Sequence, residues 1–322
     1  MSIAPQVVTL TPAPAIDRTY LVDSLQLGEV HRAHESYAEL AGKGVNVSSG
    51  LVLAGIQSLA VLPLSGEETA SANPEIIHSH TVTHPLRVNI TVLDDNGLTT
   101  KINEKTPALT TADWAGLVDT TLSLAREHGS LWILLAGTIP LSTEGSALDL
   151  QRLFEFAHDE GIHIGLDTSG APLMELARSG LPDFIKPNAP ELAECVGRPL
   201  LTLGDVVEAA QEVHGWGVTH VLVSLGPDGM VGVSSSGAVH ASTGPVTVRN
   251  TIGAGDASVA GFLSHIINYP DQFAESVATG VAWGALKVQE VSSQLHSLEG
   301  LPPVSLTVSP DLAKTLAEPG LF

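Results

Sequence analysis

Short apolar runs alternate along this chain with segments whose apolar residues recur at helical spacing. A strand buried between helices is a continuous run of Val, Ile and Leu, whereas a half-buried helix repeats its apolar positions every three or four residues. The pattern therefore predicts an α/β fold, with a central, mostly parallel sheet flanked by helices. Strands are expected at residues 7–10, 58–62, 131–135, 163–166, 184–186 and 220–224, and helices at residues 45–54, 148–158, 189–195, 206–213, 257–266 and 278–288.

Polar residues follow several of these predicted strands. In open parallel sheets, ligands bind beyond the carboxyl ends of the strands, so residues just after a strand are candidates for one shared cleft. Asp17, Gly137, Asp167, Asn188 and Ser224 are expected at those ends.

Two segments interrupt the alternation of strands and helices. Residues 19–38 show polar alternation and no helical period. Residues 86–103 contain two β-like runs around Asp94-Asp95-Asn96-Gly97, and an Asn-Gly pair is a strong signal for a hairpin turn. We expect a hairpin at residues 86–103. Residues 310–317, near the C-terminus, are expected to form a last short helix.

Composition limits the possible functions. The chain has 322 residues, of which 43% are hydrophobic, and its 14 Lys and Arg against 35 Asp and Glu give a net charge of −21. Non-specific nucleic-acid binding is excluded, because neutralising phosphates requires clustered cations. Cys195 is the sole cysteine, so no intrachain disulfide forms and a reducing compartment fits. We expect a cytoplasmic protein, because no signal peptide is visible and no apolar run approaches the ~20 residues of a membrane helix.

The most informative chemistry lies in residues 250–263, Asn-Thr-Ile-Gly-Ala-Gly-Asp-Ala-Ser-Val-Ala-Gly-Phe-Leu. Residues 253–256 stand between a predicted strand end at 246–249 and an apolar helix, whose first N–H groups have no internal partner. Such a turn binds anions, because the N–H groups and the helix dipole attract them and glycine permits close approach. Asp256 is a candidate general base for a hydroxyl that attacks phosphorus. The alternative is that Asp256 is the N-cap of the helix.

A second glycine turn, Ala41-Gly-Lys-Gly-Val-Asn46, precedes another apolar helix. Its glycines allow close backbone approach, Lys43 adds charge, and Asn46 both donates and accepts hydrogen bonds, which suits a polyhydroxylated substrate. Neither turn is a P-loop, which requires Gly-x4-Gly-Lys-Ser/Thr, and neither fits the dinucleotide fingerprint, because Ser258 replaces its third glycine. The second turn favours the catalytic interpretation of Asp256.

These motifs resemble those of the ribokinase-like sugar kinases in the phosphofructokinase-B group, and most closely the bacterial 1-phosphofructokinases. Seven segments match in order over nearly the whole chain, so the resemblance is specific although each motif alone is weak. They are Thr9–Asp17, Ala41–Asn46, Arg87–Asn89, Ala136–Pro140, Lys186–Glu191, Ser224–Gly229 and Asn250–Asp256.

The resemblance implies a ribokinase-like fold with a small β-sheet lid. The expected α/β core comprises residues 1–16, 39–84 and 108–322, and the expected lid comprises residues 17–38 and 85–107. In this group the lid covers the substrate and commonly pairs with the lid of a second copy, so a homodimer is expected. ATP and Mg²⁺ are the implied cofactors, and a small-molecule hexose phosphate is the implied partner, without nucleic acid or membrane.

The resemblance also implies roles for individual residues. Asp256 is the expected base, and the backbone of Gly253, Ala254 and Gly255 is expected to hold the transferred phosphoryl group. The expected substrate ligands are Asp17, Gly42, Lys43, Asn46, Arg87 and Arg32. The expected nucleotide-side residues are Lys186, Asn188, Ser224, Gly226, Gly229 and Thr251. Asn188 and Glu191 are expected to organise Mg²⁺ through water. Simpler roles stay open: a helix cap for Asn188, and ordinary surface residues for Arg32 and Lys43.

The activity implied is phosphorylation of fructose 1-phosphate at C6 by ATP. Phosphorylation of tagatose 6-phosphate or fructose 6-phosphate at C1 is the alternative within the family, and a non-catalytic sugar-phosphate sensor is the alternative outside it. Ala41, Asn250 and residues 103–107 depart from the usual motifs. Residues 290–294 lack the Asn and Gly common in the monovalent-cation loops of relatives, so a K⁺ site is not expected.

Overall fold

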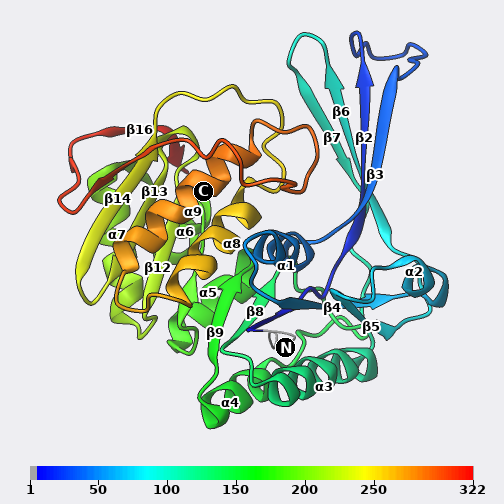
Figure 1. Cartoon of the computed structure of the whole chain (residues 1–322), viewed down its shortest axis with the longest axis horizontal. Coiled ribbons are helices and arrows are strands. Elements are labelled where there is room, and N and C mark those ends of the chain that lie inside the picture. Colours follow the sequence, from blue (N-terminus) through cyan, green and yellow to red (C-terminus); the bar gives the residue numbers. More distant parts are fainter. Residues whose placement is uncertain (1–5, 322) are drawn as a thin grey trace.

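The computed structural model describes residues 6–321, and within them a ten-stranded sheet forms the centre of the molecule (Figure 1). Its strand order is β15-β14-β13-β12-β10-β9-β8-β1-β4-β5. Strands from β12 to β5 are parallel, and β13, β14 and β15 extend one edge in antiparallel fashion. The strands are β1 (Val7–Leu10), β4 (Ser58–Leu64), β5 (Ile77–Thr81), β8 (Trp132–Ala136), β9 (His163–Asp167), β10 (Phe184–Ile185), β12 (His220–Ser224), β13 (Met230–Ser234), β14 (Gly237–Thr243) and β15 (Val304–Thr307).

Helices cover both faces of this sheet (Figure 1). One face carries α1 (Lys43–Leu53), α8 (Ala254–Ile266) and α9 (Phe273–Lys287). The other carries α3 (Thr111–His128), α4 (Gln151–Glu160), α5 (Gly170–Ser179), α6 (Ala189–Val196) and α7 (Leu203–Gly215), while α2 (Gly66–Ser71) lies beside β4 and β5. Alternate residues of a strand enter opposite cores: in β8, Trp132 and Leu134 pack with α8 and α9, whereas Ile133 and Leu135 pack with α3 and α4.

The mostly parallel sheet predicted from the apolar runs is confirmed, as are its six predicted strands, with ends shifted by up to two residues. The hydrophobic pattern did not reveal β13 and β14, because Gly232 and a Ser-rich turn interrupt their apolar positions. Among the described residues, no helix has the length and apolar character required to cross a bilayer.

A second sheet of four strands projects from the core, at the upper right of Figure 1. Its order is β3-β2-β6-β7, with β2 (Ala15–Val22), β3 (Glu35–Ala41), β6 (Arg87–Asp94) and β7 (Thr99–Asn103). The predicted hairpin is confirmed as β6–β7, where Gly97 adopts a φ of 82° and Asp94 N–H donates to the Leu98 carbonyl at 3.1 Å. The use of this sheet as a lid, with the bounds given above, stays a prediction.

The helix predicted at residues 310–317 is wrong. The chain there leads into strand β16 (Thr315–Gly320), which pairs antiparallel with β11 (Leu200–Thr202). Asp228 explains the extended conformation, because its carboxylate accepts the Ala317 N–H at 2.6 Å and lies 2.9 Å from Lys314 Nζ. Tertiary hydrogen bonds therefore override the local helical pattern.

Candidate active site

The two glycine turns found in the sequence meet in the structure. Asn46 lies in the first turn of α1 and Asp256 in the first turn of α8. Asn46 Nδ2 donates a hydrogen bond to Asp256 Oδ2 at 2.7 Å, across 210 residues of sequence. The Oδ1 atom of Asn46 is buried and has no hydrogen-bond partner among residues 6–321, so it remains available to a ligand hydroxyl.

Four ionisable side chains form a charge cluster at this point: Asp167, Lys186 and Asp256, which are buried, and Lys43, which is partly exposed. Asp167 ends β9 and is fully buried, with its Oδ1 2.9 Å from Lys43 Nζ and 3.5 Å from Lys186 Nζ. Burial alone would raise the pKa of Asp167, but the positive charges of Lys186 and Lys43 outweigh it and the pKa is lowered. Asp167 is therefore an ionised carboxylate held between two ammonium groups.

Asp256 behaves differently within this cluster. Burial raises the pKa of its carboxyl to about 6, and the negative charge of Asp167 contributes to the rise, while Lys43, the Asn46 hydrogen bond and Lys186 oppose it. A carboxyl with this pKa is mostly ionised at pH 7 and takes up a proton more readily than an exposed aspartate. These are the properties required of a general base that works near neutrality.

The turn before Asp256 is shaped to receive an anion. Gly253 is the N-cap of α8 with a φ of 81°, and no side chain caps the helix. Asp256 is the third helical residue, so its alternative role as N-cap is excluded. The Ala254 N–H donates to the Thr251 carbonyl at 3.3 Å, and the N–H groups of Gly255 and Asp256 are the first-turn donors available to a phosphate. The preceding residues 246–249 are irregular, which corrects the strand end predicted there.

Close packing requires glycine at position 253 and leaves little room at position 255. A Cβ atom on Gly253 would lie 1.9 Å from the Ser293 carbonyl oxygen. A Cβ atom on Gly255 would lie 3.3 Å from Lys186 Nζ. Lys186 therefore lies next to Asp167 and also next to residues 253–256, which we call the phosphate turn. In the other turn, a Cβ atom on Gly44 would lie 2.4 Å from Thr11 Oγ1 on the chain after β1.

Asn188 and Glu191 form a capping box at the start of α6. Glu191 N–H donates to Asn188 Oδ1, and Asn188 N–H donates to Glu191 Oε2, both at 2.8 Å. The helix-cap role left open for Asn188 is thus confirmed. One oxygen of each side chain is used by the cap, so any role toward Mg²⁺ falls to the other Glu191 oxygen and to water. Within residues 6–321 no three His, Cys, Asp or Glu residues gather as a metal site.

The residues predicted for the nucleotide lie at the neighbouring strand end. Ser224 ends β12 and forms a parallel bridge with Asn188. Gly226 and Gly229 bound the turn into β13, with φ values of 55° and 87°. Thr251 is exposed just before the phosphate turn. This arrangement is compatible with the predicted nucleotide assignments, which stay predictions.

The predicted substrate residues of the second sheet lie near its base. Asp17 lies inside β2, which corrects its expected place at the end of a core strand, and Asn89 Nδ2 on β6 donates to its Oδ1 at 3.0 Å. Burial raises the pKa of Asp17. Arg87 Nη1 donates to Thr106 Oγ1 at 2.9 Å, while its Nε is buried without a partner among the described residues. Arg87 therefore retains an unused donor.

Arg32 is not brought to this site within one chain. It is exposed in the connection between β2 and β3, beyond the pair Leu21 and Glu35. The opposite end of the same ladder holds Asp17 and Glu39. The substrate role predicted for Arg32 stays a prediction without support from the single chain.

Glu39 and Asp167 are site residues whose roles the sequence did not reveal. Glu39, on β3, accepts hydrogen bonds from Ser292 Oγ at 2.7 Å and from Ser293 Oγ at 3.0 Å. These bonds tie the second sheet to the segment that packs against Gly253. Asp167 had a detectable signal, its place after an apolar strand, but its two lysine partners come from distant segments.

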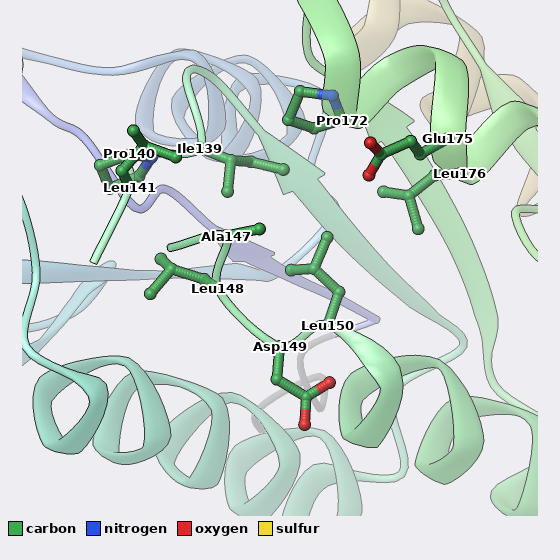
Figure 2. Close-up of a pocket in the computed structure, with 10 residues that line it drawn as sticks. All are labelled: Ile139, Pro140, Leu141, Ala147, Leu148, Asp149, Leu150, Pro172, Glu175 and Leu176. Atoms are coloured by element: carbon green, nitrogen blue, oxygen red, sulfur yellow. The ribbon is translucent and has the colours of Figure 1, made fainter. Parts of the chain in front are cut away.

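An apolar cavity of about 260 Å³ lies elsewhere, between the segment 139–150 and α5 (Figure 2). Figure 2 shows mainly aliphatic side chains around it, with Asp149 and Glu175 as its acidic residues. None of the predicted site residues lines it. Charged ligands require polar partners, which this cavity largely lacks. The charge cluster, rather than this cavity, is therefore the candidate active site.

A buried carboxylate that bridges two glycine turns, beside an uncapped helix and two lysines, is an arrangement compatible with phosphoryl transfer on an α/β fold. Comparison with known proteins agrees: the family described as pfkB family carbohydrate kinase matches residues 7–299. The chain belongs to this family and is a carbohydrate kinase.

The chain is also similar to individual members of this family. The chain is 31% identical to a 1-phosphofructokinase of Rhodobacter capsulatus over 312 residues, covering 94% of this chain and 97% of that protein. It is 35% identical to a 1-phosphofructokinase of Haloferax volcanii over 265 residues, covering 80% and 83%. The crystal structure of phosphofructokinase-2 from Escherichia coli in complex with potassium is similar in fold, with a TM-score of 0.80, 26% identity and coverage of 91% and 96%.

The raised pKa of Asp256 predicts an acid limb in the pH profile. The carboxyl is ionised above about pH 6 and protonated below it, so kcat/KM falls as the pH drops through about 6. We expect Asp256→Asn to lower kcat by at least ~100-fold, because the amide cannot accept the proton. Steady-state kinetics between pH 5 and 8 checks both expectations.

Asp159→Asn is the matched control, because Asp159 is exposed on α4. This variant should retain the activity and pH profile of the unmodified protein. A folded Asp256→Asn protein with nearly full turnover contradicts the assignment of the base.

Proposed function

We propose that the protein transfers the γ-phosphoryl group of ATP to the C6 hydroxyl of fructose 1-phosphate, giving fructose 1,6-bisphosphate and ADP. The observation that carries the proposal is the 2.7 Å bond between Asn46 and Asp256, which joins the turn suited to a sugar with the turn suited to a phosphate. The relatives called 1-phosphofructokinase support the choice of acceptor.

Asp256 acts as the base in this proposal. The C6 oxygen attacks the γ-phosphorus, its proton passes to the Asp256 carboxylate, and the bond from the γ-phosphorus to the β–γ bridging oxygen breaks to release ADP. Asn46 holds Asp256 in place and presents its free Oδ1 to the sugar. The backbone of residues 254–256 holds the transferred group: Gly255 and Asp256 supply the N–H donors, because the Ala254 N–H donates to the Thr251 carbonyl at 3.3 Å.

Lys43 and Lys186 supply positive charge to two anionic ligands. Burial opposes the charged form of Lys43, but Asp167 and Asp256 raise its pKa above the ordinary lysine value. It therefore stays protonated throughout the working pH range. Both lysines lie next to Asp167, so a bound phosphate oxygen competes with that carboxylate for their N–H donors.

ATP and Mg²⁺ fit the residues on the nucleotide side. Ser224, Gly226, Gly229 and Thr251 are assigned to the nucleotide, and Glu191 to waters of the metal. Mg²⁺ favours oxygen ligands and retains several waters, which suits a site with few free carboxylates. When bound, it neutralises charge on the β- and γ-phosphates.

The acceptor side is assigned to Asp17, Gly42, Asn46 and Arg87. Arg87 is suited to the phosphate on C1, because guanidinium binds phosphate through paired N–H donors and its Nε is unpartnered among the described residues. Burial lowers the pKa of Arg87, and the charge of Asp17 opposes this change. Asp17 is suited to the sugar hydroxyls.

The second sheet is proposed as a substrate lid that also joins two copies of the chain. It exposes large apolar residues, including Tyr37, Leu98 and Ile102, which are 38%, 68% and 59% exposed, and such surfaces favour association. A cytoplasmic homodimer is part of this proposal.

The substrate is tested by measuring ADP release with Mg-ATP and fructose 1-phosphate, fructose 6-phosphate or tagatose 6-phosphate, each at low concentration. We expect fructose 1-phosphate to give the highest kcat/KM. Preference for a 6-phosphate would retain the mechanism and reverse the sugar in the site. No release above the ATPase background with any of the three would contradict the proposed activity.

Arg87→Ala tests the position of the acceptor phosphate. We expect the KM for fructose 1-phosphate to rise at least ~10-fold while the KM for ATP changes less than ~2-fold, since a charge-assisted contact to the sugar phosphate is lost. Arg18→Ala is the control, because Arg18 is an exposed arginine on β2 of the same sheet. Equal rises of both KM values would remove Arg87 from the acceptor site.

A further inference from the structure

Lys287, the last residue of α9, is a fully buried lysine that the proposed reaction does not use. Its exposed fraction is 0%, and its Nζ has no hydrogen-bond partner within residues 6–321. An ammonium group is expensive to bury unless nearby groups compensate it. Its position therefore requires an explanation.

The side chain of Lys287 lies against the phosphate turn. A Cβ atom on Gly253, the N-cap of α8, would lie 3.4 Å from Lys287 Cε. The first turn of α8 also packs on α9, because a Cβ atom on Gly284 would lie 3.1 Å from the Ala254 carbonyl oxygen. Lys287 thus reaches the helix end that is assigned to the transferred phosphoryl group.

The residues after Lys287 hold the chain that enters this turn. The Val288 carbonyl accepts the N–H groups of Arg249 at 2.7 Å and Asn250 at 3.2 Å. Asn250 Nδ2 donates to the Val291 carbonyl at 2.7 Å, and its Oδ1 accepts the Ile252 N–H at 3.0 Å. The end of α9 and the start of the phosphate turn therefore form one unit.

Carboxylates surround Lys287 at longer range. Burial lowers the pKa of Lys287 to about 8, and the charges of Glu290, Glu39 and Asp256 oppose the change. Glu290 Oε2 is likewise buried without a partner among the described residues. Glu39 is the residue that ties the second sheet to Ser292 and Ser293. Lys287 is thus mostly protonated at pH 7. Its ammonium lies between Glu39, which connects the second sheet to the core, and the phosphate turn.

We propose that Lys287 is a positioning residue whose ammonium acts as a built-in cation behind the phosphate turn. Its Cε packs against Gly253, and its charge adds positive potential where the transferred group gathers negative charge. A fixed charge in a buried site acts strongly, because water does not screen it there. The role rests on the proposed phosphoryl transfer.

Lys287→Met tests this role, since Met matches the length of the lysine side chain up to Cε, with sulfur in place of Cδ, and lacks the ammonium. We expect kcat to fall at least ~10-fold, and the KM for the sugar phosphate to change less than ~3-fold, because the acceptor contacts remain. Ammonium chloride should restore at least a third of the lost kcat by occupying the vacated position. Tetramethylammonium chloride at equal ionic strength should restore none, because it is too large.

Leu286→Ala is the matched control, because Leu286 is the neighbouring buried residue on α9. It should lower the melting temperature and show no response to ammonium. Lys287→Gln, which keeps a donor but no charge, provides a second variant if Lys287→Met does not fold. Full turnover in a folded neutral variant, or a loss that ammonium does not reverse, would overturn the role.

The unmodified protein distinguishes failure of the proposed activity from failure of the proposed role of Lys287. If that protein phosphorylates none of the three sugar phosphates, Mg-ATP binding is measured by calorimetry instead. We then expect Lys287→Met to bind Mg-ATP at least ~5-fold more weakly and to regain affinity in ammonium but not in tetramethylammonium. Equal affinity of the two proteins would overturn the role of Lys287.

Discussion

The pairing of Asp167 with Lys43 and Lys186 is the interaction on which the site depends. Asp167 is fully buried, and an uncompensated carboxylate there would be forced toward its neutral form. The two lysines keep it charged, and its charge adds to the effect of burial in raising the pKa of Asp256. One carboxylate, through two ion pairs, thus positions two cations and adjusts the proton affinity of Asp256.

The fold makes this arrangement possible by ending parallel strands at one edge. Asp167 is the last residue of β9, and Lys186 directly follows β10. Lys43 and Asp256 lie beside them in the first turns of α1 and α8. A chain with a net charge of −21 must still attract two anionic ligands. It concentrates lysines and an uncapped helix end at one place, so the local potential differs from the overall charge.

Much of this architecture could be predicted from the sequence because its causes are local. Continuous apolar runs revealed the parallel strands, the Asn96-Gly97 turn revealed a hairpin, and glycines followed by Asp256 revealed the glycine turn at the start of α8. The family assignment also followed from local motifs in the right order.

The remaining features depend on contacts between distant segments. The Asn46–Asp256 bond, the lysine partners of Asp167, and the position of Lys287 under Gly253 have no signature in any short segment. The C-terminal strand β16 was predicted as a helix because its pairing with β11 and its bond to Asp228 are also non-local. Asp17 was misplaced because the chain leaves β1 for the second sheet sooner than the pattern indicated.

Beyond the effect of burial, the charge cluster adjusts the ionisation of Asp256. The most direct test is an NMR titration of carboxyl-labelled aspartate, with the Asp256 signal identified by its loss in an Asp256→Asn protein. Relative to the unmodified protein, Asp167→Asn should lower the pKa of Asp256 and Lys43→Met should raise it, since the first removes a like charge and the second an opposite one. Shifts in the same direction, or none in either variant, would contradict the account.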